Sequence, residues 1–212
     1  MIEAARRAER AELRAQRELT GVPDWVWDGE SLPVPIEAIA EEHYGIRIQE
    51  LDSLERFATR NQVHVSGVLL RTRALILVDG LEAARAPGRR RFTIAHELGH
   101  LVLHDGPGPR FGRPEPDTSA VATRRAPHRV YPAAFAYPPL ELEANAFAAG
   151  ILMPLSQLPA RGIWCPVQLA EACCVSLAAA EKRLEYVQWR DGRGRVGRTG
   201  LSANQRRRTE AV

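Results

Sequence analysis

The clearest chemical signature in the chain lies in the five residues His96-Glu97-Leu98-Gly99-His100. Small and apolar residues recur at helical spacing around it, namely Phe92, Ala95, Gly99 and Val102. This spacing predicts a buried helix that carries the motif. Four residues advance a helix by about 6 Å and about 40° beyond a full turn, so His96 and His100 project from one face. Both imidazoles can then bind one zinc ion at about 2.0 to 2.1 Å.

Glu97 follows the first histidine and is turned away from direct ligation. Its carboxylate is therefore available to accept a proton from a water molecule at the metal. The motif predicts two metal ligands, His96 and His100, and one general base, Glu97.

A catalytic zinc ion usually takes three protein ligands and keeps a fourth position for water. His104 is eight residues beyond His96, about 12 Å along the helix, and is too far away to share the metal. We expect it to cap the helix C-terminus. The candidates for the third ligand are Glu141 and Glu143, of which we prefer Glu143. They lie about 200° apart on a helix, so at least one must face away from the metal.

Three helical segments are expected around this site. Residues 2–19 contain strong helix formers but few large apolar side chains, which predicts an exposed helix with a weak packing stripe. A second helix is expected over about residues 36–44, ended by Gly45. A third, over about residues 140–152, carries the two acidic candidates and is stopped by Met153-Pro154.

The sheet signal is short. Residues 46–48 alternate, and residues 63–70 and 74–78 are rich in leucine and β-branched residues, which predicts about three strands. The last two are expected to form a hairpin through residues 71–73. Residues 105–139 hold eight of the fifteen prolines, so we expect no regular element there.

Residues 167–187 are expected to form two short helices, and residues 169–184 have the spacing of a helix-turn-helix. A DNA-binding regulator is therefore one alternative. However, Cys174 occupies the turn position at which glycine is easiest, and the second helix balances two acidic with two basic side chains. These four are Glu181, Lys182, Arg183 and Glu185. Such a near-neutral face binds phosphate weakly.

The net charge of +3 is unevenly distributed. Residues 190–212 hold seven arginines and two acidic residues, a net charge of +5, so the rest of the chain carries −2. This body is not basic, which argues against a surface that wraps DNA. The glycine-rich and arginine-rich tail is expected to be disordered.

The cysteines and the apolar pattern bear on the compartment. Cys165, Cys173 and Cys174 are too few, and odd in number, for a disulfide framework, so we expect buried thiols in a reducing compartment. The N-terminus lacks the apolar stretch of a secretory signal, and no run of 18 apolar residues occurs. A soluble cytoplasmic protein without a membrane partner is expected.

The chain resembles the ImmA/IrrE family of zinc metallopeptidases over about residues 33–186. The likeness is carried by R-R-F-T-I-A-H-E-L-G-H-L-V-L-H, a proline-rich interval, and E-L-E-A-N-A-F-A-A-G-I-L-M-P at residues 141–154. The resemblance implies His96 and His100 as zinc ligands, Glu97 as the catalytic glutamate and Glu143, which precedes Ala-Asn, as the third ligand.

The resemblance also implies an α+β fold, with a small, mostly antiparallel sheet of about three strands on a zincin-like helical core and a C-terminal helix pair. We divide the chain into three parts. Residues 1–32 form an N-terminal helix and a lead-in with proline and tryptophan. Residues 33–187 form the metallopeptidase domain, with the helix pair at about 166–187. Residues 188–212 form the basic tail.

The function implied is that of a bacterial or phage endopeptidase with one Zn²⁺ per chain. It would cleave a transcriptional repressor, often encoded beside it, and so derepress stress-response or mobile-element genes. No direct binding of nucleic acid is expected, and the oligomeric state stays open. An oxyanion donor could come from His128, Tyr131 or Tyr137. The strand around residues 68–77 could bind an extended substrate if one edge is free.

A non-catalytic zinc-binding regulator, acting through protein or DNA binding by the C-terminal helix pair, is the alternative. A structural zinc site is closed by four protein ligands. The presence of Glu97 and a set of three ligands argues against this alternative.

Overall fold

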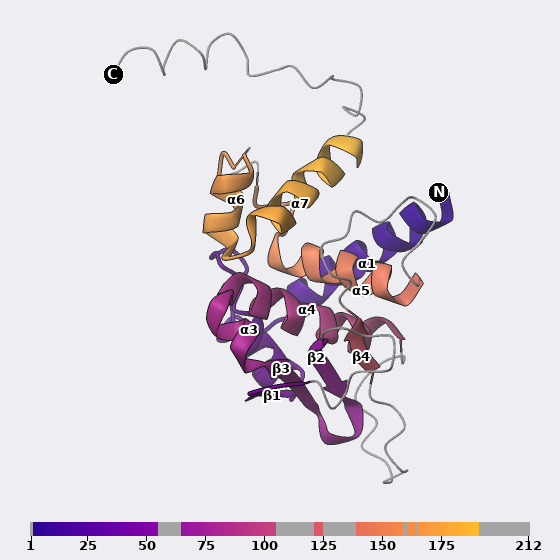
Figure 1. Ribbon diagram of the computed structural model, residues 1–212. Coiled ribbons are helices and arrows are strands. Elements are labelled where there is room, and N and C mark those ends of the chain that lie inside the picture. Colours follow the sequence, from indigo (N-terminus) through magenta and orange to yellow (C-terminus); the bar gives the residue numbers. More distant parts are fainter. Residues whose placement is uncertain are drawn as a thin grey trace.

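The structure, a computed structural model, describes residues 2–54, 65–104, 121–124, 139–158, 161–163 and 165–190. It combines helices with one mixed sheet, so the predicted α+β class is confirmed. In Figure 1 the sheet lies on one side of α4 (Pro87–His104), and α5 (Pro139–Leu152) and α1 (Ile2–Thr20) lie on the other. The helix that carries the motif is therefore the central layer of the fold.

The sheet has the strand order β1-β3-β2-β4. The strands span Arg47–Leu51 (β1), Val65–Leu70 (β2), Leu75–Asp79 (β3) and Val121–Arg124 (β4). β1 is parallel to β3, whereas the β2–β3 and β2–β4 pairings are antiparallel. β2 and β3 are joined through η3 (Arg71–Arg73) and Ala74, whose φ is 47°. The predicted hairpin is confirmed.

One prediction about the sheet is wrong, and the condition set for another is not met. β4 lies within the proline-rich interval, where no regular element was expected. Residues 117–126, between Pro116 and Pro127, contain no proline, so the backbone there can pair with β2. The expected binding edge around residues 68–77 is also not free, because β2 and β3 are both central and pair on both sides. The outer strands are β1 and β4.

Between α1 and the sheet, α2 (Ile36–Ala38) continues directly into a wider π-helical turn, η1 (Ile39–His43). Gly45, with a φ of 66°, follows it and lets the chain turn into β1, as predicted. After the hairpin, α3 (Gly80–Arg85) begins at Asp79, whose carboxylate accepts a hydrogen bond of 2.9 Å from the Glu82 backbone N–H.

α4 and α5 approach each other closely at Gly99. A Cβ atom at this position would lie 3.2 Å from both Cα and the carbonyl oxygen of Ala144. Small residues on both helices therefore allow their backbones to come together. This contact sets the first turn of α5 against the histidine face of α4.

α1 has the exposed face that the sequence indicated, but its packing stripe is more deeply buried than expected. Ala11, Ala15 and Leu19 are buried in the main core, and Glu12 is buried among them. A Cβ atom on Gly150 of α5 would lie 3.1 Å from Ala15 Cβ. Small side chains permit close helix packing that a search for large apolar residues does not detect.

The predicted C-terminal helix pair is confirmed as α6 (Pro166–Cys173) and α7 (Leu177–Arg190). Cys174 between them has a φ of 50°. α7 is tied to α1 by Arg183, whose buried guanidinium lies 3.0 Å from Glu12 Oε1 and donates to the Met153 carbonyl. In the described part of the chain, no helix has the length and apolar character needed to cross a membrane.

Gly67 in β2 offers a test of how tightly the sheet packs on α4. A Cβ atom there would lie 2.4 Å from Thr93 Cγ2 and 3.2 Å from Glu97 Oε1. We expect Gly67→Ala to lower the free energy of unfolding by about 1 to 3 kcal/mol, because α4 must move to relieve the overlap. Urea unfolding measures this.

Thr93→Ser removes the Cγ2 methyl group and provides the matched control. The double variant Gly67→Ala/Thr93→Ser should recover part of the loss in unfolding free energy. A double variant with the sum of the two single losses would contradict the overlap as the cause.

Candidate metal centre

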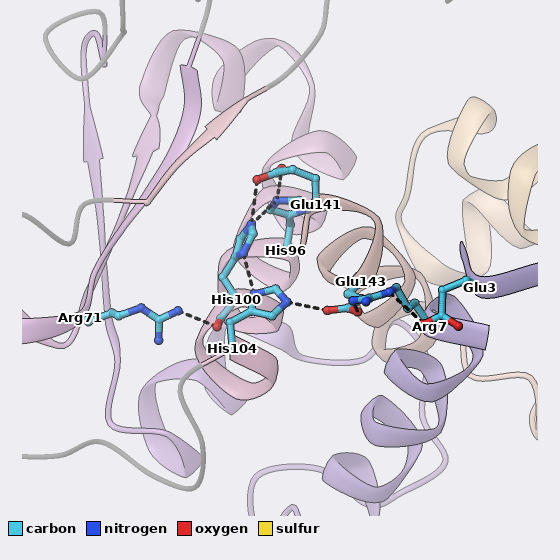
Figure 2. A network of polar contacts seen from close by, with 8 residues as sticks. All are labelled: Glu3, Arg7, Arg71, His96, His100, His104, Glu141 and Glu143. Carbon is cyan, nitrogen blue, oxygen red and sulfur yellow. Dashed lines mark hydrogen bonds and ion pairs between the residues drawn. The ribbon is translucent and has the colours of Figure 1, made fainter. Parts of the chain in front are cut away.

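The motif residues lie in the middle of α4 and are all buried. His96 Nε2 and His100 Nε2 lie 3.0 Å apart, so the two rings converge from one face of the helix, as the spacing predicted (Figure 2). Two imidazole nitrogens at this separation suit a shared metal ion better than any direct bond between them.

Glu141, in the first turn of α5, completes the cluster. Its Oε2 atom lies 3.4 Å from His96 Nε2 and its Oε1 atom lies 3.5 Å from His100 Nε2. One ligand atom from each of the three residues lies within 4.8 Å of the others. Two imidazole nitrogens and one carboxylate oxygen form a donor set that zinc accepts in sites that keep a position open for water. The residues present therefore fit the expected metal.

The structure differs from the preference for Glu143 as the third ligand. Glu143 Oε2 lies 3.1 Å from His104 Nε2, and Glu143 Oε1 lies 3.0 Å from the Arg7 guanidinium. Glu141 and Glu143 are two positions apart in sequence, which places them about 200° apart around the axis of α5. Only one of them can therefore face His96 and His100. The close approach at Gly99 selects Glu141, and Glu143 points toward α1.

Asn145 supports the cluster and was missed from the sequence. Its Oδ1 atom lies 3.0 Å from His96 Nδ1. When Nδ1 of His96 donates this hydrogen bond, Nε2 carries the lone pair that a metal requires. Asn145 is one helical turn after Glu141, so the spacing of four residues between them was the signal that could have found it.

Glu97 is fully buried, with an exposed fraction of 0%. Among the residues that the structure describes, its two carboxylate oxygens have no hydrogen-bond partner. Burial raises the pKa of Glu97 well above its usual value, and the charge of Glu141 raises it further. The Leu69 backbone amide and Arg71 act in the opposite direction. A buried acid beside a ligand cluster is placed to act as a general base toward water.

His100 is held in the form that binds metals. Burial lowers the pKa of His100 to about 3, and the neighbouring His96, His104 and Arg71 add to the effect. The imidazole is therefore neutral at physiological pH, with a lone pair available for a metal.

Arg71 was also missed. Its guanidinium donates a hydrogen bond of 2.6 Å to the His100 carbonyl oxygen, which joins the end of β2 to the last turns of α4 (Figure 2). A cation near the C-terminal end of a helix is favourable. No sequence signal distinguishes this arginine from its neighbours.

The candidates for the oxyanion donor, His128, Tyr131 and Tyr137, lie outside the described residues. β4 pairs with β2 and forms one edge of the sheet.

A family model described as the IrrE N-terminal-like domain of peptidase family M78 matches residues 41–185. The chain belongs to this family. The resemblance to ImmA/IrrE peptidases is thereby confirmed, and membership supports a metallopeptidase type of function. No curated protein matches the chain. Within this M78 domain, His96, Glu97, His100 and Glu141 lie on the two helices that the match includes.

The choice between the two acidic residues of the M78 domain is testable by zinc affinity. Glu141→Ala removes a candidate ligand, so we expect its zinc dissociation constant to rise by more than about 100-fold. For Glu143→Ala we expect the zinc dissociation constant to rise by only about 10-fold to 100-fold, as is typical when a residue that holds a ligand in place is removed. Competition with a chromophoric chelator measures both, and the reverse order would restore Glu143 as the ligand.

The burial of Glu97 predicts a pH-dependent stability difference in the metal-free chain. An acid whose folded pKa is raised destabilises the fold above that pKa, and this penalty fades as the pH falls toward the unfolded value of about 4.5. Glu97→Gln should therefore be more stable than wild type at pH 8, by about 1 kcal/mol or more, with a smaller difference in acid.

Urea unfolding of chelator-treated protein at several pH values measures this difference. Glu181→Gln, at an exposed position, is the control and should match wild type throughout. A Glu97→Gln variant less stable than wild type at pH 8 would contradict the buried, unpaired carboxylate.

Proposed function

We propose that the chain is a zinc-dependent endopeptidase that cleaves a transcriptional repressor in the cytoplasm and so derepresses stress-response or mobile-element genes. The peptidase activity is supported by family membership and by the cluster of His96, His100 and Glu141. The repressor as substrate, and the regulatory role, rest on the resemblance in sequence to ImmA/IrrE peptidases.

The observation that carries the proposal is the position of Glu97. A buried carboxylate without a partner among the described residues is costly, and it lies next to three converging metal-binding side chains. A zinc site that only stabilised a fold would not require this acid. Hydrolysis does require it, as the group that accepts a proton from water.

A zinc ion, when bound, supplies Lewis acidity that polarises the scissile carbonyl and lowers the pKa of water. His96 and His100 present their Nε2 atoms, and Glu141 presents a carboxylate oxygen. Their burial lowers the local dielectric, which strengthens each electrostatic interaction within the site.

Glu97 moves the proton. As water oxygen bonds to the carbonyl carbon, a Glu97 carboxylate oxygen accepts the proton that the water loses. The carboxyl group then delivers this proton to the amide nitrogen as the C–N bond breaks, which releases an amine and a carboxylic acid. The acid ionises to a carboxylate by losing its own proton to the amine or to solvent.

A regulator that acts by DNA binding through α6 and α7 is less well supported. Arg183, one of the two basic residues in the 181–185 stretch, is buried against Glu12 and is not presented to a phosphate backbone. Exposed side chains there are Glu181, Lys182 and Glu185. This face carries more negative than positive charge, so we expect no direct binding of nucleic acid.

Cleavage assays test the activity and the substrate separately. The zinc-loaded chain is incubated with a library of unstructured peptides, and in parallel with the purified product of any repressor gene that lies beside its own. We expect cleavage in both, detected by mass spectrometry of the products. Glu97→Gln should reduce the rate by about 10²-fold to 10⁴-fold, because it removes the proton acceptor but keeps the shape.

Glu181→Gln is the matched control, an exposed glutamate with the same change, and should cleave like wild type. Cleavage of peptides but not of the repressor would contradict the proposed substrate alone. A wild-type chain that binds zinc and cleaves neither would favour the non-catalytic regulator.

A further inference from the structure

A chain of polar contacts runs from the back of His100 to the N-terminal helix. His100 Nδ1 lies 3.0 Å from His104 Nδ1, and His104 Nε2 lies 3.1 Å from Glu143 Oε2. Glu143 Oε1 lies 3.0 Å from the Arg7 guanidinium, which also pairs with Glu3 at 3.3 Å. Figure 2 shows these side chains in one continuous line from α4 through α5 to α1.

Only one arrangement of protons allows His100 to bind a metal and every link to form. A lone pair on His100 Nε2 requires the proton on Nδ1, so His104 Nδ1 must accept it. His104 then carries its own proton on Nε2 and donates it to the Glu143 carboxylate. Arg7 donates to the other carboxylate oxygen. Each hydrogen bond thus has a donor and an acceptor. Hydrogen-bond donation runs from His100 to His104 and from His104 to Glu143.

The chain is progressively more exposed from His100 outward. The exposed fraction of the side chain is 2% for His100, 10% for His104, 18% for Glu143 and 39% for Arg7. The carboxylate is therefore shielded enough for its charge to act on His104. It is also compensated by a cation, so that burying it does not leave an unpaired charge.

We propose that His104 and Glu143, with Arg7 behind them, are positioning residues that fix the tautomer and orientation of His100 for metal binding. The proposal rests on the proposed function only in that it requires a metal at His96, His100 and Glu141. It replaces the expected role of His104 as a helix cap, because both of its ring nitrogens contact side chains. It also assigns a role to Glu143 that is distinct from ligation.

The two ligand histidines are held differently. His96 Nδ1 contacts a neutral amide, that of Asn145, whereas the contacts behind His100 end on a charged carboxylate and a guanidinium. A carboxylate behind a ligand histidine raises the basicity of the ring and holds it in place. The metal affinity of His100 should therefore depend on α1, through the ion pair between Glu143 and Arg7.

Two substitutions of His104 separate positioning from packing. His104→Gln removes the ring but keeps an acceptor for His100 and a donor for Glu143. His104→Phe keeps the ring but removes both nitrogens. Positioning predicts that the zinc dissociation constant rises by about 10-fold to 100-fold in His104→Phe and by less in His104→Gln. Packing predicts the reverse order.

The outer links are tested with Glu143→Gln and Arg7→Met. Glu143→Gln removes the charge and should weaken zinc binding severalfold or more, and Arg7→Met should have a smaller effect in the same direction. Arg14→Met is the matched control, because Arg14 is a similarly exposed arginine of α1 whose ion pair, with Glu18, lies away from the site. It should leave zinc affinity unchanged.

Zinc affinity is measured by competition with a chromophoric chelator at fixed pH, and the melting temperature of each metal-free variant checks that it folds. The visible spectrum of the cobalt-loaded chain is a second readout, because a change in ligand orientation alters the bands. Folded His104→Phe and Glu143→Gln with wild-type affinity and spectrum would overturn the proposal. A wild-type chain that binds no zinc would instead contradict the proposed function.

Discussion

The close approach of α4 and α5 at Gly99 is the constraint on which the candidate site depends. A Cβ atom at Gly99 would press on the Ala144 backbone, and Ala144 lies three residues after Glu141. The contact therefore fixes how far the Glu141 carboxylate lies from His96 and His100. Metal–ligand distances tolerate deviations of only about 0.2 Å. The glycine inside the histidine motif is thus a requirement of the helix pair.

Helical geometry then gives three residues of α5 different partners. Glu141 and Asn145 are one turn apart and face the histidines, whereas Glu143, between them, faces α1. The same helix thereby supplies a candidate ligand, a partner for the back of His96 and a partner for His104. Glu97 and Glu141 also bring two acids into a buried space, which is costly without a cation. Burying these two acids lowers the stability of the metal-free fold, but it places the groups that metal binding and proton transfer need.

Local periodicity was enough to predict α4, α5, the hairpin and the C-terminal helix pair, because each signal lies within one continuous stretch. It was not enough for α1, whose buried stripe consists of small residues such as Ala11 and Ala15 rather than large apolar ones. To identify Glu141 as the third member of the cluster, one must know how α5 is rotated about its own axis. That rotation is set by a contact at Gly99 between helices distant in sequence, which no pattern within either helix specifies.

α1 lies outside residues 41–185, the part that the family model matches, and yet it shares the core with that part. Its Glu12 neutralises the buried Arg183 of α7, and its Arg7 neutralises Glu143 of α5. Each pair leaves a charge behind if α1 departs, Arg183 in the core and Glu143 beside His104. A buried charge that loses its partner destabilises a fold by several kcal/mol, about 3 to 5 where both groups are buried. The N-terminal helix therefore belongs to the physical unit that supports the metal-binding cluster, although the family signature begins after it.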